Sequence, residues 1–265
     1  MQHSTGYIIG FTAAVCLVCS VFVAGSAVSL KDRQDANVIL DRQTKVLIVS
    51  GLMQEGEDLS PEAVGELFNS RVTPIAVDLA TGALNNEIDA GTYDQQKALR
   101  DPELSIEAAA NAAKVRRLPK VGIVFQVRSE SGELDAIIVP IEGAGLWSTL
   151  YGYLALGPDT RAIKGITFYQ HGETPGLGGE IDNPRWKSRW PGRLAFNDKW
   201  KPSISVIKGA AGSPADDPYR VDGLSGATIT SRGVDSLVKY WIGDAGFGPY
   251  LANVRGAKIK SKVKS

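Results

Sequence analysis

The segment Asp222–Ser231 carries four hydroxyl side chains within seven residues: Ser225, Thr228, Thr230 and Ser231. Apolar residues follow at positions 234, 237, 238, 241 and 242, a spacing that predicts a helix. The hydroxyls therefore lie at or near a helix N-terminus, where unpaired backbone N–H groups and the helix dipole favour a phosphate group. The same residue types are also typical of an ordinary capped helix start, and the segment alone leaves both interpretations open.

Small residues surround these hydroxyls. Gly223 and Gly226 allow a tight turn and the close approach of a partner, and the run from Ser225 to Thr228 has no bulky side chain. An unhindered hydroxyl is what a phosphoryl transfer to the protein requires. The segment is thus a candidate site for phosphate chemistry.

Two further segments are rich in glycine. Residues 141–156 mix glycines with aromatic residues, which suits either a loop beside a flat ligand or a tightly packed strand. Residues 172–179 contain four glycines and no apolar period, which predicts a loop whose amides can face a ligand.

Composition excludes several classes of function. The 265 residues contain 29 basic and 29 acidic side chains, so no overall field attracts nucleic acid. There are two histidines, which excludes histidine-rich metal sites and leaves His171 as the one base for a hydrolytic triad. No phosphate-binding or dinucleotide-binding glycine motif occurs. A chemically active protein without these groups is expected to use a cofactor.

The N-terminal region has no charged residue from Gly6 to Leu30. Roughly 20 apolar residues at about 1.5 Å each cross a hydrocarbon core of about 30 Å. A cleaved signal peptide is the rival, because Ala24–Ala27 are small, but no lysine or arginine precedes Gly6. We therefore expect a retained membrane anchor. Lys31 and Arg33 weakly favour a cytoplasmic body.

The remaining chain predicts an α+β fold, in which one N-terminal transmembrane helix precedes a soluble mixed α/β domain. Residues 121–127 and 134–140 are predicted to form a hairpin, residues 163–170 and 204–208 to be strands, and Ser60-Pro61 to start a helix. Residues 183–200 are expected to be an amphipathic surface segment, and the basic tail a disordered end. The expected divisions are an anchor (1–32), a membrane-proximal segment (33–120), a ligand-binding domain (121–254) and the tail (255–265).

The segment Asp222–Thr228 matches the Asp-x-x-Ser/Thr-Gly-Ala-Thr flavinylation motif of bacterial FMN-binding-domain proteins. With the N-terminal span, the stretch from Pro140 to Leu156 and the loop from Glu173 to Gly178, in this order, the chain resembles the C subunits of sodium-translocating NADH:quinone oxidoreductases. The resemblance covers nearly the full length. The uncharged N-terminus is a departure.

The resemblance implies that FMN is attached through its phosphate to Thr228. A magnesium-dependent flavin transferase uses FAD as the donor, and AMP leaves. The small residues Ser225, Gly226 and Ala227 give that enzyme room. The resemblance also implies ring and ribityl surroundings formed by further residues, namely Trp147, Glu173, Thr174, Leu177 and Gly178.

The implied function is electron relay. In this family the flavin of the C subunit takes electrons from an iron–sulfur centre of the membrane subunits and passes them to FMN on the B subunit. The complex has six subunits, A to F, and it oxidises NADH, reduces ubiquinone and moves sodium. It lies in the bacterial inner membrane, with the soluble body of the C subunit in the periplasm.

Two alternatives remain from the sequence. One is the flavoprotein subunit of the related ferredoxin:NAD oxidoreductase complex, which shares the anchor and the motif. The other is an anchored binding module without a cofactor, in which Ser225–Ser231 merely cap a helix.

Overall fold

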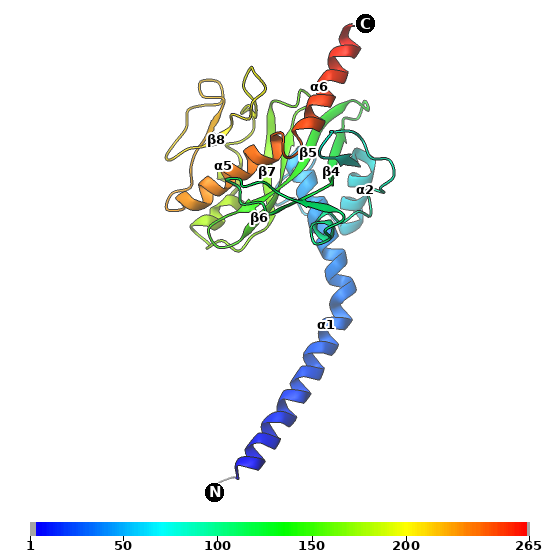
Figure 1. Ribbon diagram of the computed structural model, residues 1–265, viewed down its shortest axis with the longest axis vertical. Coiled ribbons are helices and arrows are strands. Elements are labelled where there is room, and N and C mark those ends of the chain that lie inside the picture. The colour runs from blue at the N-terminus through cyan, green and yellow to red at the C-terminus, as the bar shows by residue number, and fades with distance from the viewer. Residues whose placement is uncertain (1–3, 264–265) are drawn as a thin grey trace. The chain divides into compact units, whose positions relative to one another are not determined.

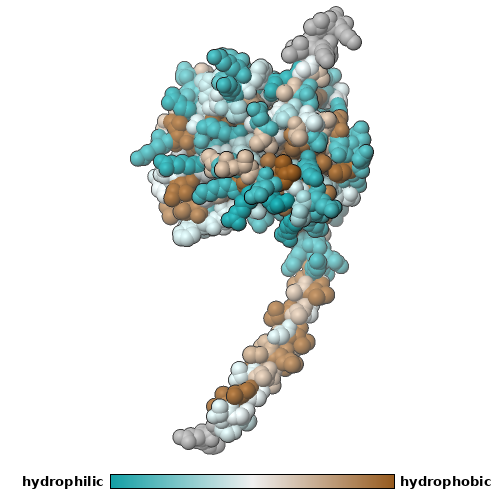
Figure 2. All heavy atoms as spheres, viewed as in Figure 1, coloured by the Kyte–Doolittle hydropathy of each residue, from teal (hydrophilic) through white to brown (hydrophobic). Residues whose placement is uncertain are grey.

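The computed structural model describes residues 4–263, which form two units: one ends at Arg42 and the other begins at Gln43. The first unit is helical and belongs to α1 (Thr5–Ser50). Every side chain from Thr5 to Ile39 is exposed, and most are apolar or neutral (Figure 2). Exposed apolar side chains over this length are unfavourable in water, and α1 is long and apolar enough to cross a membrane.

A five-stranded antiparallel sheet forms the centre of the second unit, with the order β1-β4-β5-β6-β7 (Figure 1). The strands are β1 (Val72–Asp78), β4 (Val121–Arg128), β5 (Leu134–Ala144), β6 (Thr149–Leu156) and β7 (Ile163–Gln170). The predicted hairpin of β4 and β5 is confirmed, and so is the strand predicted at residues 163–170. The glycine-rich stretch 141–156 is mostly strand, with a turn at residues 145–148.

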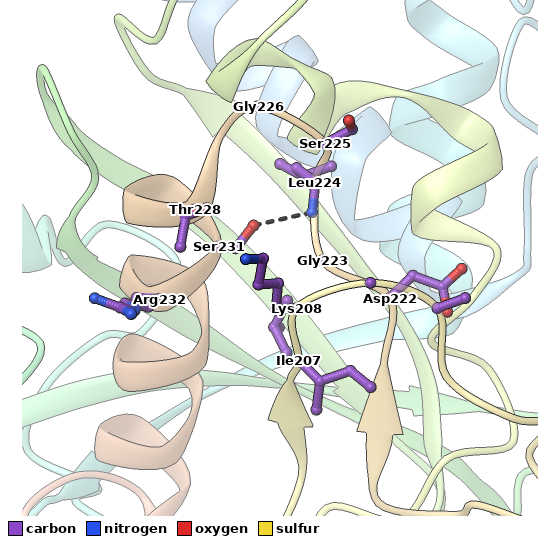
Figure 3. A pocket seen from close by; sticks show the side chains of 13 residues that line it. Ile207, Lys208, Asp222, Gly223, Leu224, Ser225, Gly226, Thr228, Ser231 and Arg232 are labelled. Atoms are coloured by element: carbon purple, nitrogen blue, oxygen red, sulfur yellow. Dashed lines mark hydrogen bonds between the residues drawn. The ribbon is translucent and has the colours of Figure 1, made fainter.

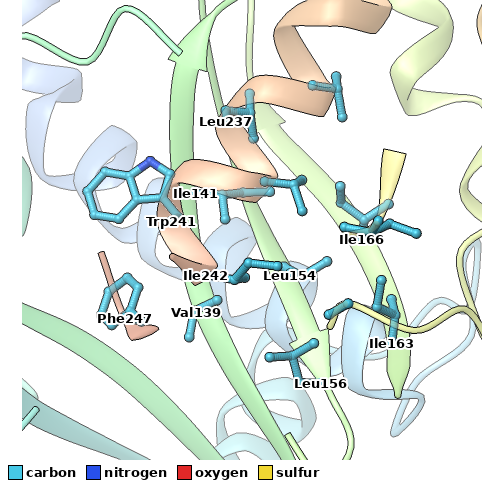
Figure 4. Packing of buried hydrophobic residues seen from close by; sticks show 14 of the residues in the cluster. Val139, Ile141, Leu154, Leu156, Ile163, Ile166, Leu237, Trp241, Ile242 and Phe247 are labelled. Atoms are coloured by element: carbon cyan, nitrogen blue, oxygen red, sulfur yellow. The ribbon is translucent and has the colours of Figure 1, made fainter. Parts of the chain in front are cut away.

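Helix α5 (Thr228–Ile242) packs on one face of this sheet. The helix predicted from the apolar spacing is confirmed, and its five periodic apolar residues are all buried against strand residues that include Val139, Ile141 and Leu154 (Figure 4). Glycines allow the close approach: a Cβ at Gly233 would lie 2.3 Å from the Ala144 carbonyl oxygen. The packing of these side chains thus fixes the distance of α5 from the sheet and its rotation about its own axis. The position of its first turn follows from both.

The other face of the sheet, by the alternation of strand side chains, carries aromatic residues such as Phe125 and Tyr153. Helix α2 (Pro61–Arg71) places Phe68 against Phe125. The Ser60 hydroxyl accepts a hydrogen bond from the Ala63 amide at 3.2 Å, so the predicted helix start is confirmed. The end of α1 is buried too, and a Cβ at Gly165 would lie 2.9 Å from the Val49 carbonyl oxygen.

Shorter elements complete the unit: α3 (Gln95–Ala98), β2 (Ser105–Glu107), β3 (Arg117–Pro119), η1 (Gly178–Asp182), α4 (Pro184–Lys187), β8 (Ser205–Val206), β9 (Arg220–Val221) and α6 (Gly248–Val263). The α+β class with one long apolar N-terminal helix is confirmed. Strand β1 pairs with β4 along its whole length, so the segment expected to be membrane-proximal supplies an edge of the same sheet.

Two predictions are wrong in detail. Residues 183–200 are amphipathic, as predicted, with Arg185 and Arg189 exposed, but Trp186 and Trp190 are buried in the core and are not at the surface. The start of the tail is ordered, since α6 continues into it and the Arg255 guanidinium lies 4.2 Å from the Trp200 ring centroid. The last two tail residues lie outside the described part of the chain.

Candidate functional site

The first turn of α5 separates the four hydroxyls into two kinds. Thr230 and Ser231 are buried, and both are hydrogen-bonded: the Thr230 hydroxyl donates to Glu173 at 2.7 Å, and the Ser231 hydroxyl accepts from the Leu224 amide at 2.9 Å. Ser225 and Thr228 are exposed. Only the latter pair is therefore accessible to a reacting phosphate.

Thr228 stands at the start of α5. Gly226 adopts a φ of +73°, which turns the chain into the helix, and no side chain caps the helix at Ala227. Because the first amides of a helix have no partner within it, they are available to an anion at this end. The exposed hydroxyl and the uncapped helix end coincide at Thr228.

Glu173 joins the three segments of the site. Its carboxylate accepts hydrogen bonds from the amides of Leu146 (3.2 Å), Trp147 (2.9 Å) and Ser148 (3.2 Å), and from the Thr230 hydroxyl. We call this set the Glu173 network. Burial alone would raise the pKa of Glu173, but these hydrogen bonds outweigh it and hold the pKa below its ordinary value. A fixed negative charge thus ties the turn after β5 to α5.

Two glycines leave room for that carboxylate. A Cβ at Gly145 would lie 2.5 Å from Glu173 Oε1, and one at Gly178 would lie 2.6 Å from both Glu173 Oε2 and Thr230 Oγ1. Any larger residue would push the network apart. Gly178, a predicted site residue, therefore has a packing role: the absence of a side chain leaves room for the Glu173 carboxylate.

Loop residues beside Glu173 are held by polar contacts that the sequence did not reveal. His171 Nε2 lies 2.7 Å from Asp182 Oδ2, while its Nδ1 accepts a hydrogen bond from the Glu173 amide. The Ser148 hydroxyl accepts from the Gly172 amide at 2.6 Å. The first and last of these contacts join residues 11 and 24 positions apart, so no local pattern could have indicated them.

Four exposed apolar side chains belong to the same segments, and we call them the apolar rim: Leu146, Trp147, Leu177 and Ile229, of which Trp147 is 72% exposed. Leu177 lies against the turn, since a Cβ at Gly226 would be 3.1 Å from its Cδ2. Thr174 is exposed in the same loop. A surface with apolar side chains next to an accessible hydroxyl fits an amphipathic ligand that has a flat ring and a phosphate.

A cavity of about 650 Å³ lies beside the first turns of α5 (Figure 3). Its walls are residues 206–210, the motif segment from Asp222 to Gly226, and Thr228, Ser231 and Arg232. The Asp222 carboxylate accepts a hydrogen bond from the Ala211 amide at 2.8 Å, and its carbonyl accepts from the Trp186 indole. The motif aspartate thus holds the loop in front of the helix.

Comparison with known proteins assigns the class first. The sequence model of the FMN-binding domain matches residues 145–243, from the turn after β5 to the end of α5. All the predicted site residues lie in this range.

Full-length relatives then identify the family. The chain is 44% identical over 98% of its length to the C subunit of the Na(+)-translocating NADH-quinone reductase of Yersinia pestis, and covers 97% of that protein. It is 45% identical over 96% of its length to the same subunit of Pseudomonas aeruginosa, again covering 97%. The crystal structure of Shewanella oneidensis NqrC matches with a TM-score of 0.75 at 33% identity, over 82% of this chain and 97% of that one. The chain belongs to the family of C subunits of Na(+)-translocating NADH-quinone reductases.

Proposed function

We propose that this chain is the FMN-carrying electron-transfer subunit of a sodium-translocating NADH:quinone oxidoreductase, and that FMN is bound through its phosphate to Thr228. The observation that carries the proposal is the exposed Thr228 hydroxyl at an uncapped helix start, held beside the apolar rim by the Glu173 network. The family supports FMN as the ligand. Bound FMN supplies one-electron and two-electron transfer.

Attachment takes place at Thr228 Oγ1. The hydroxyl oxygen forms a bond to the FMN phosphorus of FAD, the diphosphate bond breaks, AMP leaves and the hydroxyl proton is released. A flavin transferase carries out this step. Ser225, Gly226 and Ala227 take part as small neighbours that leave the hydroxyl accessible, since two of the three are exposed and none has a bulky side chain.

The residues proposed to surround the flavin ring and ribityl chain have two different roles. Trp147 and Leu177 supply exposed apolar contacts for the ring, and Thr174 supplies an exposed hydroxyl. Glu173 already accepts four hydrogen bonds, as many as its two oxygens hold, so it positions the surrounding loops. Gly178 does the same by leaving space for Glu173.

Electrons pass, in this proposal, from an iron–sulfur centre of the membrane subunits through this chain's flavin to FMN on the B subunit, within a complex of six subunits, A to F. The first unit anchors the chain in the bacterial inner membrane, and the soluble body lies in the periplasm. The exposed apolar surface of α1 supports the anchor.

The test is the covalent state of Thr228. Full-length protein is co-expressed with the flavin transferase, and its intact mass and its flavin fluorescence on a denaturing gel are measured. We expect one flavin mononucleotide on the wild type, none on Thr228→Ala, and full retention on the matched control Ser225→Ala. Flavin that survives denaturation in Thr228→Ala would overturn the attachment site.

A further inference from the structure

Two basic side chains line the cavity beside Thr228. Lys208 follows the end of β8, and Arg232 lies on α5. Both side chains are exposed. Neither belongs to the flavinylation motif.

Ion pairs neutralise charges on the segments next to the cavity walls. Arg189 lies 3.7 Å from Asp222, Arg220 lies 2.8 Å from Asp217, and Lys239 lies 2.9 Å from Asp235. Within residues 4–263, Lys208 and Arg232 have no such partner. The cavity therefore keeps two positive charges in a chain whose formal net charge is zero.

Asp222 does not neutralise them. It is the one acidic residue among the described residues that line the cavity. Its carboxylate is engaged by the Ala211 amide and faces away from Lys208 and Arg232 across its own loop (Figure 3). The residues that line the cavity thus include two cations, Lys208 and Arg232, and one carboxylate that is already engaged.

Lys208 and Arg232 flank the first turns of α5 on either side of Thr228 (Figure 3). Arg232 follows Thr228 by four residues, so the two side chains are neighbours on one face of α5. Lys208 approaches from the other side, with its ammonium group directed at the start of α5 near Ser231 (Figure 3). The first amides of the helix add a favourable field at the same end.

We propose that Lys208 and Arg232 form a binding site for the phosphodiester that tethers the flavin to Thr228. This proposal rests on the proposed function. A phosphodiester carries one negative charge on two non-bridging oxygens, and ammonium and guanidinium groups are the side chains that bind such oxygens most strongly. The site holds the tether against the protein, so that the ring is presented to the apolar rim in one orientation.

The experiment measures the environment of the phosphorus atom in the flavin-loaded, full-length protein in detergent. Phosphorus NMR spectra are recorded in the native state and after unfolding in urea, and the difference in chemical shift is the readout. The variants are Lys208→Met/Arg232→Gln, the charge-retaining Lys208→Arg/Arg232→Lys, and the control Lys199→Met/Arg185→Gln, which removes two exposed charges outside the cavity walls.

We expect Lys208→Met/Arg232→Gln to lose at least half of the shift difference of the wild type. The charge-retaining variant and the control keep most of it. A difference unchanged from the wild type in Lys208→Met/Arg232→Gln would overturn the site, as would a wild type whose native and unfolded shifts coincide. If the double variant does not acquire flavin, the two single variants are compared, and each is expected to lose part of the difference.

Failure of the proposed function gives a different result. A wild-type protein that releases all its flavin on unfolding has no phosphodiester at Thr228. A protein that keeps its flavin but shows the same phosphorus shift in every variant contradicts the Lys208–Arg232 site alone.

Discussion

Two glutamates that are partly or wholly removed from solvent have pKa values shifted in opposite directions. Glu173 accepts four hydrogen bonds, and its pKa lies below the ordinary value. Glu142, on β5, is half-buried, and no hydrogen bond reaches its carboxylate from the residues that the structure describes; desolvation raises its pKa to about 7. Desolvation raises the pKa of both carboxyl groups. The hydrogen-bond donors around Glu173 reverse the direction of its pKa shift, and Glu142 has no such donors. The donors lie in the turn at residues 145–148 and on α5, which positions Thr228. Glu173 therefore keeps its negative charge, whereas Glu142, three residues before the same turn, has no donors that would favour its charged form.

Removing the charge of Glu173 tests this contrast most strongly. In Glu173→Gln the amide nitrogen faces N–H donors, and at least one buried donor loses its acceptor. We expect the free energy of unfolding to fall by about 3 kcal/mol near neutral pH, since the hydrogen bonds are charge-assisted and buried. Urea denaturation of the full-length protein measures it. Glu130→Gln, at a side chain 94% exposed, is the control and should change nothing measurable.

The difference in the free energy of unfolding between wild type and Glu173→Gln should depend on pH with a definite sign. A lowered pKa in the folded state contributes stability above the unfolded value of about 4.5, and this stability is lost as the pH falls through the folded pKa. The gap between wild type and Glu173→Gln should therefore be constant above about pH 5 and shrink in more acidic solution. A gap that widens on acidification would contradict the Glu173 network.

Gly178→Ala tests the space around the network without removing a charge. The added Cβ would lie 2.6 Å from both Glu173 Oε2 and Thr230 Oγ1, so these atoms must move apart. We expect a loss of about 2 kcal/mol and incomplete flavin attachment. Gly65→Ala is the matched control, because nothing lies within 4 Å of its Cβ on helix α2, and it should stabilise slightly. Equal effects of the two substitutions would contradict the crowding argument.

Glu142→Gln should act in the opposite direction. The folded protein keeps a proton on Glu142 between the ordinary pKa of about 4.5 and about 7, so wild-type stability falls as the pH rises through this window. We expect the variant to be about 1 kcal/mol more stable than wild type at about pH 8, after allowance for its partial exposure, and equal to it at about pH 4. A variant that is less stable than wild type at about pH 8 would show that the carboxylate has a partner.

The smallest expected effect on stability is that of Trp147→Ala. Its side chain is 72% exposed, so the free energy of unfolding should change by less than about 0.5 kcal/mol. The absorption spectrum of the bound flavin should change, because the proposed ring contact is lost. The exposed Trp200→Ala, outside the apolar rim, should leave that spectrum as it is. A large destabilisation would show that the Trp147 side chain stabilises the fold and is not kept free for the ligand.

The sequence predicted the parts of the site that depend on local spacing. The 3.6-residue period of residues 234–242 located α5, and the motif placed Thr228 at its start. The Glu173 network could not be predicted, because its donors are 25 to 57 residues away and are mostly backbone amides, which nearly every residue type provides. The burial of Trp186 and Trp190 in the core was not predicted, for a similar reason. The basic residues between them suggested a surface, whereas the tertiary fold buries the rings and lets Lys187 pair with Glu55.

The end of α1 has a practical consequence for protein production. Residues from Gln43 onward belong to the second unit, where Val46, Leu47 and Val49 are buried. A soluble fragment for expression should therefore begin after the uncharged apolar stretch, which ends at Leu30, and no later than Gln43. One that begins at Gly51, just after the helix ends, would lose these three apolar side chains and the buried Ser50, and would yield aggregated material.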